Sequence, residues 1–322
     1  MLDLARLQKL SLAKRPLGQI LFAQLVLQID YRLPRRTHIV LEGVENIPSD
    51  RSVFFAMNHT DRYNCWPFQY QMYRQNLPFT ATWVKGKYYE NSVMGFFMDH
   101  TNNIPIPSRG YVITTTFRKQ TGRTPSRDEY RFIRDLVDGN CELNTEFPES
   151  PAPDFVQFLA QRSAQVDLIK ETFAAMSQVV VDHSLWAMED LGLNILIFPQ
   201  GTRSIRMLPG HTGLAQMAHR LNADIVPVGC NGSDQLYPGN SPLSKGGTVT
   251  YRIGSPISPR DSATNQVPPS ALPFSDEAAE QYGEIYQRTT RRVDDAINAL
   301  LDPAYQMAED DAQAGGDASR FV

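Results

Sequence analysis

Hydrophobic positions along the chain form short runs of β-branched and aromatic residues, separated by stretches of helical pattern. Short apolar runs bounded by turn residues are typical of buried strands. We predict strands within residues 37–47, 52–59, 78–89, 102–108, 194–201, 223–232 and 247–257. Helices are predicted within residues 64–75, 168–192 and 211–222. This alternation predicts an α/β fold with a mainly parallel central sheet flanked by helices, whose ligands gather beyond the carboxyl ends of the strands.

The segment from Arg15 to Arg36, RPLGQILFAQLVLQIDYRLPRR, is a mostly apolar helical pattern interrupted by glutamines. It is too short and too polar to cross a bilayer. Basic residues flank it on both sides, at Lys9, Lys14, Arg15, Arg32, Arg35 and Arg36. This pattern predicts an interfacial helix that lies against phospholipid headgroups. A helix that packs on the domain core, or on a second subunit, is the alternative.

The pattern divides the chain into three regions. Residues 1–36 form the membrane-associating N-terminal region, and residues 37–302 form the main domain. Within that domain, residues of about 112–165 are rich in charge and proline, which predicts an inserted segment with short helices. The small and acidic residues at 303–322 predict a flexible tail.

Composition narrows the class of protein. With 42% hydrophobic and 20% charged residues the chain is a globular protein, and its net charge of −4 gives no general attraction to nucleic acid. The three cysteines, Cys65, Cys141 and Cys230, are widely spaced and form no C-x-x-C pair. They indicate neither a disulfide framework nor a zinc site, so a cytoplasmic location is expected.

Two loops carry the candidate chemistry. NHTDRYN, from Asn58 to Asn64, follows a predicted strand, and FPQGTRS, from Phe198 to Ser204, ends another. The imidazole of His59 has an ordinary pKa near neutrality, so it can accept a proton and later return it. An arginine in a glycine-containing loop suits the binding of a phosphate group. We interpret the two loops as halves of one active site.

These loops occur in order with three further blocks, VKGKYYENSVMGFF, NNIPIPSR and IVPVGCNG. Together the five blocks resemble the glycerolipid acyltransferase family, in particular the 1-acylglycerol-3-phosphate acyltransferases, over residues of about 37–257 outside the insertion. The resemblance implies transfer of a fatty acyl group from a thioester of coenzyme A or acyl carrier protein to the hydroxyl of a lysophospholipid, with lysophosphatidate as the expected acceptor. It implies no cofactor and no metal, and a peripheral association with the inner face of the membrane.

The resemblance also implies roles for individual residues. His59 matches the family's catalytic histidine, which takes the proton of the acceptor hydroxyl. Pro227 matches the proline of the last block, on the acyl-donor side, and Gly95 matches a glycine between the first two blocks. The residues matched to substrate binding are Lys85, Arg109, Gln200, Gly201, Thr202 and Arg203.

Two positions depart from the family pattern. The family has an aspartate five residues after the histidine and a glutamate in FPEGTRS, where this chain has Asn64 and Gln200. An asparagine can orient an imidazole through its carbonyl oxygen, but it brings no charge to stabilise the imidazolium. Asp61 is the alternative carboxylate close to His59 in the sequence.

Two other functions remain open. The chain can be a protein of the same fold that binds lipid or acyl chains without turnover, since both carboxylates are replaced. It can also be a metal-dependent oxygenase, because His59 and Asp61 with a distant His183, His211 or His219 have the form of a 2-His-1-carboxylate site.

Overall fold

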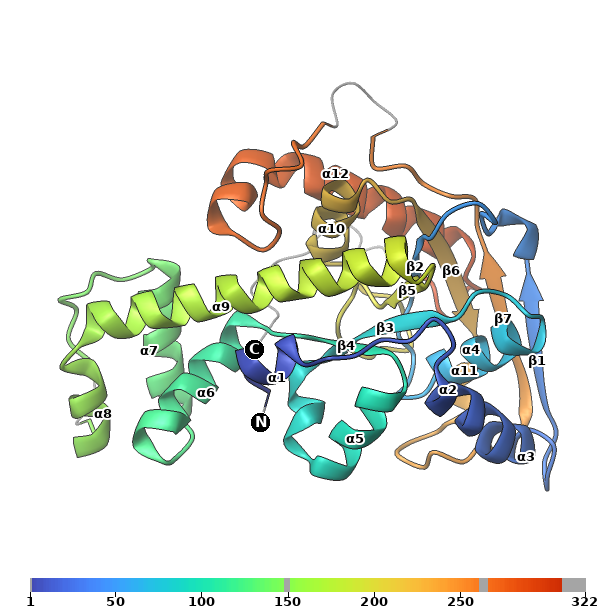
Figure 1. The fold of residues 1–322 in the computed structure, drawn as a ribbon, viewed down its shortest axis with the longest axis horizontal. Coiled ribbons are helices and arrows are strands. Elements are labelled where there is room, and N and C mark those ends of the chain that lie inside the picture. Colours follow the sequence, from blue (N-terminus) through green and yellow to red (C-terminus); the bar gives the residue numbers. More distant parts are fainter. Residues whose placement is uncertain (1, 148–150, 261–265, 309–322) are drawn as a thin grey trace.

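The protein is described from a computed structural model that covers residues 2–147, 151–260 and 266–308. A single sheet of seven strands runs through it, in the order β1-β7-β6-β2-β5-β3-β4 (Figure 1). The strands are β1 (Thr37–Glu42), β2 (Phe54–Met57), β3 (Thr80–Lys85), β4 (Asn103–Ile106), β5 (Asn194–Ile197), β6 (Ile225–Asn231) and β7 (Gly247–Ile253). The α/β class with a mostly parallel sheet flanked by helices is therefore confirmed.

One pair of neighbouring strands, β6 and β7, is antiparallel, and every other neighbouring pair is parallel. The five strands from β6 to β4 therefore share one direction, while β7 and β1 run the opposite way. The sequence pattern agrees with this division. Strands β2, β5 and β6 are buried at every position, whereas β1 alternates between half-buried and exposed residues. Continuous apolar runs are typical of parallel strands covered on both faces, and alternation is typical of an edge.

Helices cover both faces of the sheet. Phe54 and Ala56 of β2 point into one apolar core, and Phe55 and Met57 point into the other. The longer helices are α4 (Cys65–Arg74), α5 (Ser92–His100), α6 (Arg109–Thr121), α7 (Arg127–Asp138), α9 (Arg162–Leu185), α10 (Gly213–Leu221) and α12 (Asp276–Ala299). Short elements complete the described chain: α1 (Leu4–Gln8), α2 (Leu17–Phe22), η1 (Ala23–Leu27), α3 (Gln28–Asp30), η2 (Val44–Asn46), η3 (Gly86–Glu90), α8 (Pro153–Leu159), η4 (Trp186–Asp190) and α11 (Ser233–Leu236).

The inserted segment expected at about 112–165 corresponds to most of α6, all of α7 and α8, and the first turn of α9. These helices extend away from the sheet (Figure 1). Their aromatic side chains Phe117, Phe132 and Phe155 belong to the same apolar core as the sheet residue Phe54. The segment is therefore packed onto the domain rather than attached by a linker.

The N-terminal region shows features of both interpretations of its sequence. Leu2, Leu7 and Leu12 lie in the main core, and Ala23 and Leu27 pack in the core on the other face. Residues 2–36 therefore pack against the domain, and deleting them would remove core side chains. The opposite face of the helix at 17–30 remains exposed. None of the helices in the described residues is both long and apolar enough to cross a membrane.

The expected tail at 303–322 begins as a packed segment. Tyr305 is buried, and its carbonyl oxygen accepts a hydrogen bond from the backbone N–H of Met207 at 2.8 Å. The rest of the expected tail, residues 309–322, lies outside the described residues.

Candidate active site

The loop that carries His59 begins where β2 ends, and Asn58 holds it there. The side-chain amide of Asn58 donates to the carbonyl oxygen of Cys230 at 3.0 Å, and its oxygen accepts from the N–H of Cys230 at 2.7 Å. Cys230 lies in β6, the neighbour of β2. This two-way pairing extends the contact between the two strands by one residue, so His59 leaves the sheet at its carboxyl edge.

Asn64 contacts the imidazole of His59. Its side-chain oxygen lies 3.1 Å from Nδ1 of His59, and its side-chain nitrogen donates to the carbonyl oxygen of Asn58 at 2.8 Å. Because the amide nitrogen is needed by that carbonyl, the amide oxygen must face the ring, and Nδ1 must carry the proton. The unprotonated nitrogen is then Nε2. Asn64 therefore selects the tautomer in which Nε2 can accept a proton.

The structure also holds Asn64 itself firmly. Its side chain is fully buried and makes no cap for α4, which begins at the next residue. Its carbonyl oxygen accepts a hydrogen bond from the hydroxyl of Tyr251 in β7 at 2.7 Å. Asn64 is thus held by Asn58, which follows β2, and by Tyr251 in β7, in the position that orients His59.

The second loop packs on the first. The rings of Phe198 and His59 stack with their centroids 4.1 Å apart and their planes 20° from parallel. The N–H of Ser204 donates to the carbonyl oxygen of His59 at 2.9 Å. The loops NHTDRYN and FPQGTRS, expected from sequence to form one site, are in direct contact.

Gln200 joins the same two loops. Its side-chain oxygen accepts from the backbone N–H of His59 at 3.2 Å, and its side-chain nitrogen donates to the carbonyl oxygen of Thr202 at 2.8 Å. A glutamate at this position can accept the first bond but cannot donate the second. The same reasoning applies to Asn64, which donates to Asn58. Each amide therefore lies between a donor and an acceptor: Gln200 between two backbone groups, and Asn64 between the imidazole of His59 and the backbone carbonyl of Asn58.

Among the described residues no hydrogen bond or ion pair joins Asp61 to His59, so this geometry favours Asn64 over the alternative carboxylate as the partner of the imidazole. The carboxylate accepts from the hydroxyl of Thr60 at 2.9 Å and from the N–H of Tyr63 at 2.8 Å. The second bond closes a tight turn between His59 and Asn64. Burial raises the pKa of Asp61, although hydrogen bonds from Tyr63 and Thr60 oppose this. Asp61 therefore stabilises the turn of the loop, and Asn64 is the residue that bonds to the imidazole.

Positive charge surrounds His59. Burial lowers the pKa of His59 to about 4, and the charges of Arg203 and Lys85 act in the same direction, while the hydrogen bond to Asn64 opposes them. The pKa of Lys85 is lowered by burial and by the charges of Lys87 and Arg203. Within the described residues no carboxylate pairs with Lys85, Lys87 or Arg203. A cluster of cations without counter-ions beside a neutral imidazole is suited to an anionic ligand.

Several residues expected at the site are engaged elsewhere. The guanidinium of Arg109 donates to Asp138 at 2.7 Å and to Asp276 at 2.5 Å, and it lies over the ring of Phe173. These contacts join α6 to α7, α9 and the start of α12. Arg109 is thus a structural link in this arrangement, and no described contact brings it to His59.

Other expected residues shape the backbone. The N–H groups of Gly201 and Thr202 donate to the carbonyl oxygens of Phe198 and Gln200, so they form the turn rather than point to a ligand. Gly201 has a φ of +63°, which an L side chain rarely adopts. Pro227 is buried in β6 beside Ala56, and Gly95 lies against the guanidinium of Arg6. Of the expected substrate residues, the exposed side chains of Lys85 and Arg203 lie near His59.

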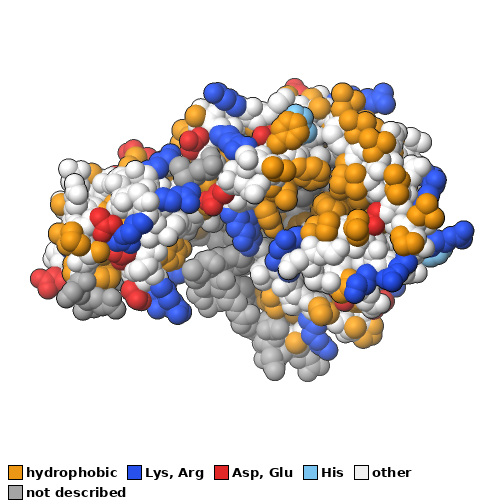
Figure 2. All heavy atoms as spheres, turned by 90° about the horizontal axis from the view of Figure 1, so that it is seen from below, with side chains coloured by type: hydrophobic (Ala, Val, Ile, Leu, Met, Phe, Trp, Pro, Cys, Tyr) orange, Lys and Arg blue, Asp and Glu red, His pale blue; other side chains and the backbone are white. Residues whose placement is uncertain are grey.

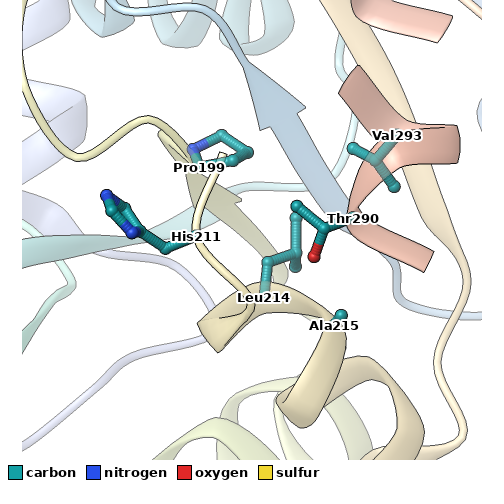
Figure 3. A pocket seen from close by; sticks show the side chains of 6 residues that line it. All are labelled: Pro199, His211, Leu214, Ala215, Thr290 and Val293. Atoms are coloured by element: carbon teal, nitrogen blue, oxygen red, sulfur yellow. The ribbon is translucent and has the colours of Figure 1, made fainter. Parts of the chain in front are cut away.

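The sequence offered His211 only as one of three alternative metal ligands of an oxygenase. Its N–H donates to the carbonyl oxygen of Pro199 at 2.9 Å, and burial and the charge of Lys85 lower its pKa to about 4. Figure 3 shows it at a narrow crevice behind the loop, with its ring turned away from Thr290 and Val293 on α12. Next to it, the N–H of Gly210 donates to the buried carboxylate of Asp294 at 2.8 Å. The loop that carries Arg203 is therefore tied to α12.

Sequence reasoning missed the roles of Asn58 and Phe198, and it considered His211 only as a metal ligand. Asn58 lies in NHTDRYN and Phe198 in FPQGTRS. Their position directly after a predicted strand could have identified them as residues that hold the loops. No sequence pattern could predict that His211 lies close to Lys85, because the two residues come from segments far apart in the chain.

The residues required for an oxygenase do not come together. His183 bonds to the carbonyl oxygen of Leu7 through Nε2 at 2.8 Å, and His219 is buried with Nε2 2.9 Å from the hydroxyl of Thr289. Across residues 2–147, 151–260 and 266–308, no group of three or more His, Cys, Asp or Glu side chains is arranged to hold a metal ion.

Comparisons with known proteins give similarity to solved structures only. No protein-family model matches the chain, and no curated protein matches it. The crystal structure of the 1-acyl-sn-glycerophosphate (LPA) acyltransferase PlsC from Thermotoga maritima is similar to 91% of this chain and 78% of that one, with 16% identity and a TM-score of 0.40. At this level of similarity we transfer no residue role or activity from it.

Proposed function

We propose that this protein is an acyltransferase that moves a fatty acyl group from a thioester donor to the hydroxyl of a lysophospholipid-type acceptor. The observation that carries the proposal is the neutral imidazole of His59, oriented by Asn64 and placed beside the uncompensated charges of Lys85 and Arg203. The five sequence blocks that resemble the glycerolipid acyltransferases support it. Lysophosphatidate is the expected acceptor, and coenzyme A or acyl carrier protein the expected donor.

In the proposed reaction Nε2 of His59 accepts the proton of the acceptor hydroxyl while the hydroxyl oxygen attacks the thioester carbonyl. Collapse of the tetrahedral intermediate forms the ester and breaks the carbon–sulfur bond. The imidazolium then returns its proton to the leaving thiolate. Asn64 keeps Nδ1 protonated throughout, which holds the ring in the required tautomer.

The acceptor's phosphate has a second effect in this scheme. Burial is the main cause of the low pKa of His59, and the charges of Arg203 and Lys85 lower it further. A phosphate bound between Lys85 and Arg203 neutralises their charge, so their part of the lowering is removed, the pKa of His59 rises and the base becomes stronger when the acceptor is present. Binding of the correct substrate thus prepares the base.

The experiment that tests the function is an assay of the purified protein with labelled acyl-coenzyme A or acyl-acyl carrier protein and a panel of lysolipids. Products are resolved by mass. A labelled diacyl product that requires both substrates supports the proposal, and absence of any acyl product with every acceptor contradicts it.

A protein that binds lipid without turnover is the second candidate. The low pKa of His59 and the neutral Asn64 favour it, because neither stabilises an imidazolium. Saturable binding of lysolipid or acyl thioester, with no product in the same assay, would identify this function.

The pH dependence of the reaction follows from the lowered pKa of His59. A base must be unprotonated, so activity falls as the pH drops through its pKa. For kcat/KM, which reports the free enzyme, we expect the acid limb near pH 4. For kcat, which reports the substrate complex, we expect the limb at higher pH, because the bound phosphate offsets Lys85 and Arg203. Coincident limbs near pH 6.5 for both parameters would contradict this coupling.

Arg203 tests the placement of the phosphate. Arg203→Ala should raise the KM for the acceptor by about 10-fold to 100-fold, the value of a charge-assisted hydrogen bond, with little change in the KM for the donor. Arg203→Lys should restore this only in part, because lysine lacks the bidentate fork. The matched control is Arg206→Ala, an exposed arginine of the same loop. An acceptor KM unchanged in Arg203→Ala would place the phosphate elsewhere.

A further inference from the structure

The loop that carries Arg203 leaves β5 and returns to its own start. The backbone N–H of His211 donates to the carbonyl oxygen of Pro199 at 2.9 Å, so the two ends of the loop meet. We call residues 199–211 the Arg203 loop. Within it, the N–H of Ser204 donates to the carbonyl oxygen of His59 at 2.9 Å. The place of Arg203 beside the imidazole therefore depends on how this closed loop is held.

Contacts from outside the Arg203 loop hold its returning half. The N–H of Met207 donates to the carbonyl oxygen of Tyr305 at 2.8 Å. The N–H of Gly210 donates to Oδ2 of Asp294 on α12, also at 2.8 Å. The second contact uses a side chain, so a substitution on α12 can remove it and leave the sequence of the loop unchanged.

Asp294 lies directly against the place where the two ends of the loop meet. A Cβ added to Gly210 would lie 2.7 Å from Oδ1 of Asp294 and 3.0 Å from Cβ of Pro199. Figure 3 shows Pro199 on the loop side of this junction and Thr290 on the side of α12. Because no side chain fits between the helix and the loop, a glycine at position 210 allows the contact.

The carboxylate of Asp294 is enclosed by protein. Asp294 is 7% exposed. Helix α12 runs along the upper side of the molecule in Figure 1, so it lies behind the face that Figure 2 shows from below. Asp294 therefore acts on the Arg203 loop from within the protein.

The burial of this carboxylate is unfavourable for folding. Within the described residues Oδ1 of Asp294 has no hydrogen-bond partner, and a buried carboxylate that is only partly bonded costs free energy. Burial raises the pKa of Asp294 to about 7, although the bond from Gly210 opposes this. Polar groups that are kept at such a cost are typical of functional sites.

We propose that Asp294 is a positioning residue: by holding the N–H of Gly210, it places the guanidinium of Arg203 where it can bind an anionic phosphate. Gly210 follows Arg203 by seven residues, so the effect of Asp294 passes through the backbone of the loop. The inference rests on the proposed function for the identity of the ligand. The position of the loop and its affinity for phosphate are measured without turnover.

The test compares substitutions on α12 in the full-length protein. Asp294→Ala removes the acceptor of the Gly210 N–H, and Asp294→Asn keeps an oxygen for it. The matched control is Asp295→Ala, which removes the neighbouring exposed carboxylate of the same helix. Isothermal titration calorimetry gives the dissociation constant of inorganic phosphate, and hydrogen exchange of residues 201–210 reports on the loop. Thermal unfolding verifies that each variant is folded.

We expect Asp294→Ala to weaken phosphate binding by about threefold to tenfold, less than Arg203→Ala, because the guanidinium is still present but less well placed. The amides of residues 201–210 should exchange faster in this variant. Asp294→Asn and Asp295→Ala should bind phosphate like the wild type. In the acyl-transfer assay, Asp294→Ala should raise the KM for the acceptor and change kcat and the KM for the donor little.

A double variant tests whether Asp294 acts through Arg203. In an Arg203→Ala background, Asp294→Ala should cause little further loss of phosphate affinity, because the group that it positions is already absent. Gly210→Ala changes the same junction from the side of the loop, and its Cβ should reproduce the loss by displacing the carboxylate. Its control is Gly283→Ala on α12, where an added Cβ meets no atom within 4 Å.

Three results would overturn the proposal. The first is unchanged loop exchange and phosphate affinity in Asp294→Ala. The second is an equal loss in Asp294→Asn, since the hydrogen bond to Gly210 would then not be the cause. The third is an additive loss in the double variant, which would show that Asp294 acts independently of Arg203.

The failure of this inference is distinct from that of the proposed function. A wild type that binds no phosphate would overturn both the positioning role and the placement of the acceptor at Arg203. A wild type that binds phosphate, loses affinity in Asp294→Ala and yields no acyl product would contradict the acyltransferase function alone.

Discussion

Replacing His59 with alanine is expected to lower kcat for acyl transfer by about 10²- to 10⁴-fold, the contribution of a positioned general base. The fold should persist, because the imidazole is partly exposed and its described side-chain contacts are the stacked ring of Phe198 and the amide of Asn64. The measurement is single-turnover transfer of a labelled acyl group, with circular dichroism and thermal unfolding on the same sample.

His100→Ala is the matched control for this experiment. His100 is an exposed histidine at the end of α5, and its Nδ1 bonds to the carbonyl oxygen of Phe96 at 2.8 Å. It should retain wild-type activity toward a soluble short-chain acceptor. If His59→Ala kept more than a few per cent of the wild-type rate, His59 would not be the base.

Asn64→Ala is expected to have the second largest effect, because it removes the group that selects the tautomer of His59. Loss of tautomer control in a serine protease triad costs about 10⁴-fold in turnover, and we expect a loss of about 10²- to 10⁴-fold here. Asp61→Ala should cost much less in kcat, since Asp61 contacts Thr60 and Tyr63 instead of the imidazole. Its effect should appear mainly as a lower melting temperature. Equal losses of kcat in the two variants would show that the loop as a whole, rather than Asn64, orients the base.

Carboxylates at the two amide positions provide a sharper test. Asn64→Asp and Gln200→Glu restore the residues of the family pattern, yet each removes a donor from a backbone carbonyl, that of Asn58 or that of Thr202. An unsatisfied buried polar group costs about 1–3 kcal/mol in the free energy of unfolding. We therefore expect lower stability and no gain in turnover from either change. The double variant should be made too, because groups that act on one imidazole are rarely additive. A large gain in activity would mean that the site has decayed and would favour the lipid-binding function.

The positions of the strands could largely be predicted from the sequence. Phe54 to Met57 and Asn194 to Ile197 are continuous apolar runs, and such runs identify buried parallel strands wherever they fold. The reversed direction of β7 was not readable, because strand direction depends on which neighbour the strand meets. The helical run at 15–36 could be recognised as apolar, but sequence alone left open whether it packs or remains exposed. The structure shows that it does both, on opposite sides.

The sequence by itself determined that His59 stands at the end of a strand and that FPQGTRS ends another, because strand ends and glycine turns are local properties of the chain. Only the tertiary structure decided which partner holds the imidazole. Asn64 has the family's spacing and Asp61 has the family's carboxylate, so the sequence left both open. The contacts of Asn58, Cys230 and Tyr251 place Asn64 against the ring. The tertiary structure also decided that Arg109 pairs with Asp138 and Asp276, whereas Arg203 and Lys85 form no ion pair with any carboxylate of the described residues. Electrostatic fields and hydrogen bonds act through space, so the charge around a residue follows from the fold and not from its neighbours in the sequence.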